Sequence, residues 1–454
     1  MEILINKNIL IVVYFIFTAI LIYKFKFKLY SFLTLFISYT FITYFLGYII
    51  FEYYPELSTL IPLPKNRNHG YFNENYYHYS FFIFLIGYIF FSIPFFIFKN
   101  NKFNLKKIKI DLNLRKIKII NLFIIFILMN FFSFAIRKNF NVGVPTGIPN
   151  NKIAEYVWYT FDYLTIILLI YVIYNGLLSK SLFHNFLSFI SPFIYGITVS
   201  ILGWKSGFIW AFIITLHIMT VLKYFYNENV RFIKTKICVF FLVTVLLMPS
   251  IFIMSNDLRS DKNFLMKMNL NIIVNKINYY FDKPINAENI IYIFNRITGI
   301  SPLFITVAYE DVNSENNVSF FSNLFQRGTY QPETYFGCDL LKIHAACPPP
   351  TTTFAPTSWS IFYIYNGIYG VMIGFFILGV ISSLLEYLFL HSNNKSIIIT
   401  IYTATFSISF PAMIFEGTIA FYFKRHLLSL LLAFIIFLLF LLLINKLKKL
   451  KSAY

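Results

Sequence analysis

Charged residues are scarce in this sequence, and that scarcity excludes most soluble folds. Asp, Glu, Lys and Arg make up 13% of the 454 residues, whereas hydrophobic residues make up 58%. A soluble domain carries about a quarter charged residues. The apolar residues gather in runs such as 119–136 and 426–444, and about twenty such residues cross a bilayer core of about 30 Å. The composition therefore predicts a membrane protein.

Motifs that bind nucleotides or metals are absent as well. The sequence contains no P-loop, no GxGxxG before a helix, no HExxH and no cysteine-rich metal spacing. These absences argue against an ATP-driven pump or a zinc enzyme, and we expect neither a metal nor a cofactor.

Cysteine is nearly absent, with three residues in the whole chain. Cys238 falls in an apolar stretch, where we expect it to be inert core. Cys338 and Cys347 lie close together in one long polar segment, so in an oxidising compartment we expect them to form a disulfide.

The fold class expected from hydropathy is an all-α polytopic membrane protein with about eleven transmembrane helices. The expected spans cover residues 8–23, 30–52, 79–98, 119–136, 156–178, 186–203, 208–222, 237–255, 360–389, 397–415 and 426–445. Three regions follow from this assignment. Residues 1–255 form a bundle of eight spans, 256–358 form a large loop with short helices, and 359–454 add three spans and a basic tail.

The net charge of +19 falls almost entirely on one face of this arrangement. Placing Lys24, Lys26 and Lys28 in the cytoplasm puts nearly the whole basic surplus there, as the positive-inside rule expects. The large loop is then periplasmic and the basic tail is cytoplasmic. The lipid bilayer accounts for the charge, so we expect no nucleic-acid partner.

A set of basic residues is nevertheless expected on the opposite face, where positive charge is less usual. Arginine binds phosphate oxygens through two parallel hydrogen bonds, so these residues are candidates for a pyrophosphate site. The alternative is that they anchor spans at the membrane interface. The set comprises Arg137, Lys205, Arg259, Arg296, Arg327 and Arg425.

Small and acidic residues inside the spans have mainly structural interpretations. Gly367, Gly370, Gly374 and Gly379 recur at a spacing that lets transmembrane helices approach closely. Asp162 lies within an expected span, where an acid indicates either a structural polar contact or a lined cavity.

One segment resembles a known family. Phe354-Ala-Pro-Thr-Ser-Trp-Ser-Ile-Phe-Tyr-Ile-Tyr-Asn-Gly367-Ile-Tyr-Gly370-Val-Met-Ile-Gly374-Phe-Phe-Ile-Leu-Gly379 resembles the loop exit and following span of Wzy-type O-antigen and oligosaccharide repeat-unit polymerases. Gly203-Trp-Lys-Ser-Gly207 is similar to the short turn between two central spans of that family. Asn295-Arg296-Ile-Thr-Gly299 is similar to its arginine-bearing loop helix.

The resemblance implies glycosyl transfer at the periplasmic face of a bacterial inner membrane. The donor would be a glycan on undecaprenyl pyrophosphate and the acceptor one lipid-linked repeat unit, with a flippase and a chain-length regulator as possible partners. Basic residues could stabilise the departing pyrophosphate without a metal.

A general base for the acceptor hydroxyl would come from acidic or imidazole groups on the outer face. The candidates are His344, Glu333, Asp339 and Glu416. Two alternatives stay open: an O-antigen ligase with the same architecture, and a flippase or other transporter. The long loop argues against a transporter, whose loops are typically short.

Overall fold

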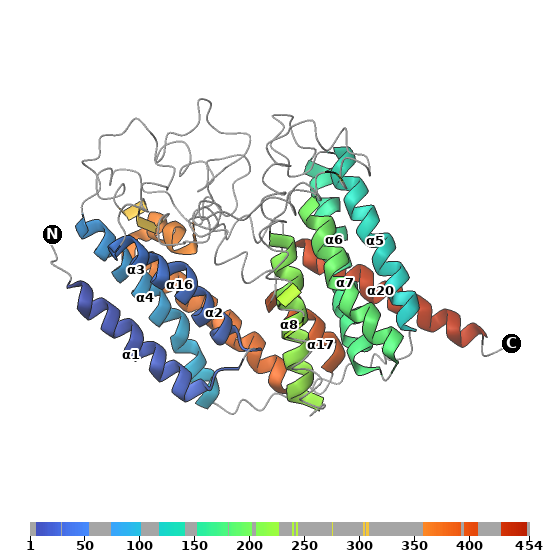
Figure 1. Ribbon diagram of the computed structural model, residues 1–454, viewed down its shortest axis with the longest axis horizontal. Coiled ribbons are helices and arrows are strands. Elements are labelled where there is room, and N and C mark those ends of the chain that lie inside the picture. Colours follow the sequence, from blue (N-terminus) through green and yellow to red (C-terminus); the bar gives the residue numbers. More distant parts are fainter. Residues whose placement is uncertain are drawn as a thin grey trace. The chain divides into compact units, whose positions relative to one another are not determined.

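The computed structural model is a helical protein, and no strand occurs in the part of the chain that it describes (Figure 1). It describes residues 6–28, 30–53, 74–100, 118–140, 152–179, 181–201, 206–226, 238–239, 242–243, 275, 303–304, 306–307, 357–391, 395–406 and 428–451.

Within these residues, 7 helices are long and apolar enough to cross a membrane. They span Lys7–Phe25, Phe32–Ile50, Tyr76–Lys99, Ile119–Ile136, Val157–Leu178, Leu182–Val199 and Ser358–His391. Each coincides with an expected span, so the prediction of helices is confirmed for these segments, and their length and apolar composition indicate a membrane-embedded protein.

The remaining expected spans are matched less fully. The segments 208–222 and 426–445 overlap two shorter apolar helices, Trp210–Lys223 and Leu428–Phe440. The segment 397–415 overlaps the ten-residue helix Lys395–Ala404, and 237–255 lies almost wholly outside the described residues. The expected count of eleven therefore stays a prediction.

The chain divides into two compact units, and both are built from segments far apart in the sequence. Unit 1 holds the helices α1 (Lys7–Phe25), α2 (Phe32–Thr40), α3 (Leu46–Tyr53), α4 (Glu74–Asn100) and α16 (Ser358–His391), with the π-helical turn η1 (Phe41–Phe45) joining α2 to α3. Unit 2 holds α5 (Ile119–Phe140), α6 (Lys152–Leu178), α7 (Leu182–Ile201), α8 (Ser206–Tyr226), α17 (Lys395–Ala404) and α20 (Leu428–Lys451).

The N-terminus of α2 is capped both by its own N-cap residue and by a side chain from another helix. The Ser31 hydroxyl accepts a hydrogen bond from the Leu33 amide at 3.2 Å, as an N-cap residue does. The Glu386 carboxylate, from near the end of α16, accepts from the Ser31 hydroxyl at 2.9 Å and the Phe32 amide at 3.0 Å. A carboxylate is favoured at a helix N-terminus because the unpaired amides there carry partial positive charge. This contact ties α16 to α2.

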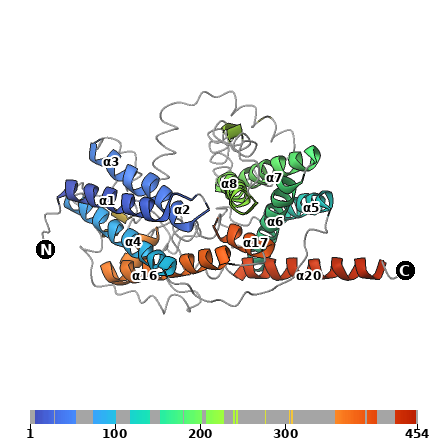
Figure 2. The same ribbon diagram turned by 90° about the horizontal axis from the view of Figure 1, so that it is seen from below.

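The core of unit 1 is a continuous cluster of aromatic rings. The rings of Phe36 on α2 and Phe91 on α4 stack with centroids 3.9 Å apart, and Tyr14 on α1 stacks on Phe45 of η1 at 4.6 Å. Trp359 on α16 lies 5.9 Å from Phe36. Such ring pairs add stabilisation beyond their buried area. Figure 2 shows α1, α4 and α16 of this unit from below.

Unit 2 is organised around one buried helix instead. In this unit α6 packs against α5, α7, α8, α17 and α20, and its stretch from Ile166 to Ile173 is buried throughout. Polar pairs join the surrounding helices: Asn130 of α5 donates to the Thr198 hydroxyl of α7 at 3.1 Å, and His217 of α8 lies 3.0 Å from the Thr403 hydroxyl of α17. Hydrogen bonds of this kind help to hold transmembrane helices together.

The position of Cys238 corrects one expectation. This residue is a free and exposed cysteine, not the buried core residue that its apolar surroundings predict. In a membrane protein an apolar segment can face lipid, so hydropathy does not distinguish the interior from the lipid-facing surface.

Candidate functional site

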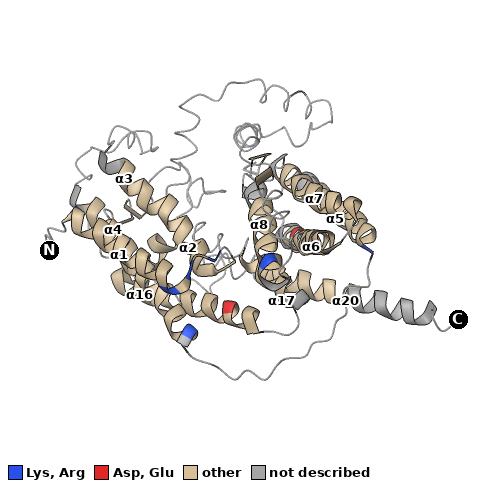
Figure 3. Ribbon diagram, turned by 60° about the horizontal axis from the view of Figure 1, so that its bottom comes forward, with Lys and Arg blue, Asp and Glu red and all other residues tan. Residues whose placement is uncertain are grey.

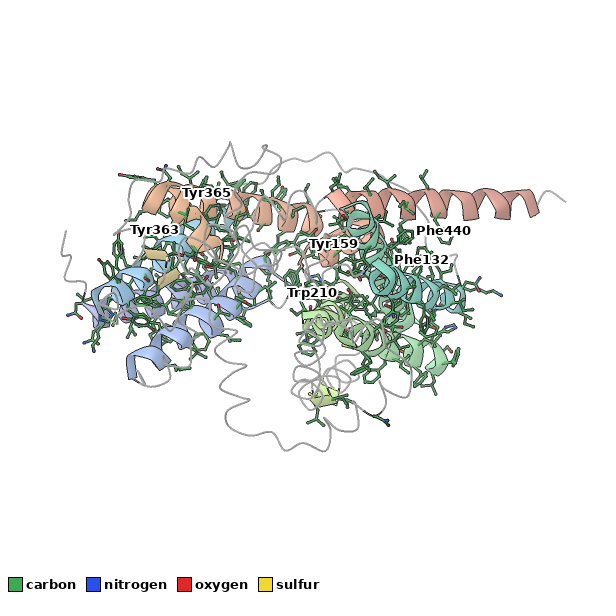
Figure 4. The ribbon with its side chains drawn as sticks, turned by 90° about the horizontal axis from the view of Figure 1, so that it is seen from above. Phe132, Tyr159, Trp210, Tyr363, Tyr365 and Phe440 are labelled. Carbon is green, nitrogen blue, oxygen red and sulfur yellow. The ribbon has the colours of Figure 1, made fainter. Side chains whose placement is uncertain are left out.

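The segment that resembles the polymerase family does not form one straight helix. Asn366 (φ −161°, ψ 36°) and Gly367 (φ 55°, ψ −141°) break α16 into a short arm, 358–365, and a long helix, 368–391. A positive φ is favourable for glycine because it has no Cβ, so Gly367 is suited to this turn. Figure 4 shows Tyr363 and Tyr365 on the short arm.

The arm folds back along the helix that follows it. The ring centroids of Trp359 and Phe375 are 4.0 Å apart, although sixteen residues of straight helix would separate them by about 24 Å. The carbonyl of Phe362 lies against Gly370, and the Phe362 ring lies against Gly374. These two glycines therefore allow a close approach, as predicted, but between two parts of one segment.

The other two glycines of the series have different roles. Gly379 lies against the Phe91 carbonyl and Pro94, so it lets α16 approach α4 closely. Gly367 has open space around its α-carbon and serves the turn. Close helix packing is thus confirmed for Gly379.

The arm begins in the interior of unit 1. Trp359 lies against Gly87, halfway along α4, and its Nε1 donates to the Phe84 carbonyl at 3.2 Å. Trp359 is 0% exposed, so the arm is anchored in the core of the unit.

Hydroxyl groups surround the first turn of the arm. The Thr357 and Ser360 hydroxyls lie 3.2 Å apart, and both residues are buried together with Ser358. The Tyr44 hydroxyl faces the Thr357 side chain. The start of the arm is therefore a polar spot inside an aromatic core.

A second polar cluster lies at the end of unit 1 where α4 begins. The Tyr48 hydroxyl lies 2.7 Å from Nδ1 of His78, and the Tyr77 hydroxyl donates to the Tyr48 carbonyl at 2.8 Å. His78 is half-buried, whereas Tyr48 is fully buried. We call Tyr48, Tyr77 and His78 the tyrosine–histidine cluster.

This cluster and the turn of α16 lie at the same end of unit 1. Beyond the turn, α16 runs in the same direction as α4, because Phe375 lies near Gly87 and Gly379 near Phe91. Extending this register toward the beginning of both helices brings Gly367 to the level of His78.

The long segment after α8 also reaches the tyrosine–histidine cluster. Phe304 meets the Tyr77 ring edge-on, with centroids 5.7 Å apart, and the neighbouring Leu303, Thr306 and Val307 are buried. Residues 303–307 follow closely after Arg296 in the sequence. Part of the expected loop 256–358 is thus packed against the first turn of α4.

The geometry at His78 suits proton transfer. When Nδ1 donates to the Tyr48 oxygen, Nε2 carries the lone pair and can accept a proton. The structure gives Nε2 no hydrogen bond to any described residue. The half-buried imidazole is therefore a base candidate that the sequence analysis missed. Its one signal is the run Tyr76-Tyr-His78-Tyr79 at the start of an apolar span.

The roles of the site residues predicted from the sequence stay predictions. Arg137 belongs to α5, but its side chain is not described. The others lie outside the described residues: His344, Glu333, Asp339, Glu416, Lys205, Arg259, Arg296, Arg327, Arg425, Cys338 and Cys347.

Asp162, the acid expected inside a span, is described. It is 4% exposed on α6 and has an interaction partner. This fits the structural polar contact that was one of its two interpretations. Within the described ranges, no three His, Cys, Asp or Glu side chains gather as a metal site would require.

Comparisons with known proteins find no match to this chain among family models, curated proteins or solved structures.

Proposed function

We propose that this protein is a Wzy-type polymerase, which joins lipid-linked oligosaccharide repeat units at the periplasmic face of a bacterial inner membrane. The observation that carries the proposal is the segment from Phe354 to Gly379, whose pattern resembles the family. In this segment Gly367 permits the turn and Gly370 permits the close approach of the Phe362 carbonyl, so both glycines of the pattern have a structural role.

The reaction is a glycosyl transfer between two lipid-linked substrates. A hydroxyl of the acceptor repeat unit attacks the anomeric carbon of the donor glycan, and a new glycosidic bond forms. The bond between that carbon and the pyrophosphate breaks, and its electron pair leaves with undecaprenyl pyrophosphate. The acceptor proton passes to a base on the protein.

We assign the base role in this proposal to Nε2 of His78. Its partner Tyr48, 2.7 Å from Nδ1, would fix the tautomer and orient the ring. The departing pyrophosphate would be stabilised by basic residues such as Arg296 and Lys205, since fixed positive charge near a developing anion lowers the barrier. His344, Glu333, Asp339 and Glu416 stay as the alternative bases.

The proposal fixes the orientation of the chain. Residues 256–358 and His78 would face the periplasm, and the Lys24 side the cytoplasm, as the charge distribution predicts. Reporter fusions at Asn316 should then report a periplasmic location, and fusions at Asn227 a cytoplasmic one. A cytoplasmic location for Asn316 would contradict the proposed active face.

The surface glycan of a strain that lacks the gene tests the activity. A single repeat unit on the lipid core, restored to a ladder by the wild-type gene, is the expected result. Free polymer without any glycan on the core would identify a ligase. Lipid-linked units accumulating in the cytoplasmic leaflet would identify a flippase.

A further inference from the structure

Lysine side chains converge at the end of unit 1 opposite to the tyrosine–histidine cluster. Lys24 lies in the last turn of α1, Lys26 and Lys28 in the link to α2, and Lys99 in the last turn of α4. Figure 3 shows these basic segments in blue beside the ends of α1, α2 and α4. We call these four residues the lysine cluster.

The Lys24 side chain of α1 contacts α4, and the Lys99 side chain of α4 contacts α1. The Lys24 ammonium lies 4.7 Å from the ring centroid of Phe96 on α4. The Lys99 ammonium lies 4.8 Å from the ring centroid of Phe25 on α1, and it donates to the Lys24 carbonyl. These contacts fix the positive charges in place, because an aromatic face and a helix C-terminus both attract cations.

Local interactions also fix the conformation of the link between α1 and α2, which carries Lys26 and Lys28. Lys26 has φ 54°, a left-handed conformation that is unusual for a residue with a side chain. The Lys28 amide donates to the Thr34 hydroxyl at 3.2 Å, and the Lys28 ammonium lies 5.7 Å from the Tyr30 ring centroid. The link between α1 and α2 is therefore anchored to both neighbours.

The cluster carries more positive charge than the nearby acid can balance. The charges of Lys24, Lys28 and Lys26 all act repulsively on Lys99. The described part of the chain places one acid at this end, Glu386, whose carboxylate accepts from Ser31 and Phe32 and is also attracted by the Lys28 charge, so one acid faces four lysines. Like charges held close together are destabilising unless an anion lies between them.

Apolar side chains flank the lysines. Ile22, Tyr23, Phe27 and Ile97 are exposed large hydrophobic residues, and Tyr23 is 89% exposed. A free phosphate ion would gain nothing from them, whereas the acyl chains below a lipid headgroup would contact them. We propose that the lysine cluster binds the phosphate of an anionic phospholipid, with the acyl chains packed along the ends of α1 and α4.

Lipid titration into the full-length protein in a neutral detergent tests this site. Bound lipid is counted by native mass spectrometry, with phosphatidylglycerol as the anionic probe and phosphatidylcholine as the neutral one. The wild type should retain phosphatidylglycerol selectively. The triple variant K24Q/K26Q/K99Q should bind it about 100-fold more weakly, since each lysine near a membrane surface contributes about fivefold.

Two matched variants serve as controls. One tests whether the loss of net charge alone weakens binding, and the other tests whether replacing the lysines disturbs the fold. K7Q/K118Q/K223Q removes the same charge from exposed lysines elsewhere and should retain lipid like the wild type. K24R/K26R/K99R keeps the charge and should also retain it. All variants should elute as the wild type does on size exclusion.

Three results would overturn the proposal. The first is unchanged phosphatidylglycerol binding by K24Q/K26Q/K99Q, and the second is an equal loss in K7Q/K118Q/K223Q. The third is displacement of the lipid by millimolar inorganic phosphate, because the cluster would then be a phosphate site without a lipid preference.

Discussion

The two units bury similarly apolar sequences in different ways. Unit 1 fills its interior with rings, such as the stacked pair Phe36 and Phe91. Unit 2 surrounds the mostly aliphatic stretch 166–173 of α6 and links its outer helices through polar pairs such as His217 and Thr403. Unit 1 also buries hydroxyl groups among its rings, as at Thr40 and Ser92, but its tyrosine–histidine cluster and its lysine cluster lie at its two ends.

The two described histidines with tertiary hydrogen bonds show the difference most clearly. His78 is half-buried at the end of unit 1 and pairs with Tyr48, whereas His217 is 1% exposed within unit 2. The same side chain has a candidate chemical role in one unit and a packing role in the other.

The largest expected effect concerns these two residues. Under the proposed function, His78→Ala should lower the chain-extension rate at least about 100-fold, the usual contribution of a general base, with little change in thermal unfolding. His217→Ala should lower the unfolding temperature instead. Rates are measured on isolated membranes supplied with lipid-linked repeat units.

Tyr48→Phe refines the same comparison, because it keeps the ring but removes the partner of His78. The rate should fall, though less than in His78→Ala, while the protein stays folded. A wild-type rate in both His78→Ala and Tyr48→Phe would remove the cluster from the proposed mechanism.

The next effect tests the aromatic core of unit 1. Trp359→Ala should destabilise the protein by about 3 kcal/mol, since truncating a buried Trp leaves a cavity, and it removes the hydrogen bond to the Phe84 carbonyl. Thermal unfolding followed by size exclusion measures the change. Tyr369→Ala on the same helix is the control, because Tyr369 is 70% exposed and should matter little.

A smaller effect is expected where α16 crosses α4. Gly379→Val should destabilise unit 1 by about 2 kcal/mol, because its side chain would meet the Phe91 carbonyl and force the helices apart. Gly367→Ala would meet open space, but should still cost about 1–3 kcal/mol for its backbone conformation alone. A loss near zero for Gly379→Val would show that unit 1 does not depend on this close approach of the two helices.

The smallest effect tests the polar pairs of unit 2. Thr403→Val should cost about 1 kcal/mol, because hydrogen bonds between membrane helices are typically worth that or less. A double-mutant cycle with His217→Phe measures the coupling between the two side chains directly. Coupling near zero would show that this pair does not contribute to the stability of unit 2.

Hydropathy predicted most of the helices because apolar length is a strong signal, but it could not reveal the turn in α16. The run from Ser358 to His391 is apolar enough on average to read as one span, so composition does not show that Phe362 returns to Gly370. The expected span 360–389 is longer than a bilayer core of about 30 Å requires, and that excess was the available sign.

The tyrosine–histidine cluster was also beyond sequence reasoning. Tyr48 and His78 are thirty residues apart, and the hydrogen bond between them depends on how α3 meets the first turn of α4. Phe304 reaches the same place from a distant segment. In a chain with 34 Tyr residues and 7 His residues, no local pattern marks the pair that meets.

The turn in α16 has a consequence for how this protein is made. Insertion into the bilayer depends on the hydropathy of the segment, and 358–391 is long and apolar enough to cross the membrane as a single helix. The arm contacts Phe375 within α16, and it also contacts Phe84 on α4 and Phe36 on α2, which are synthesised much earlier. We therefore expect α2 and α4 to be in place before the arm takes its final position, so that they provide the surface on which it packs.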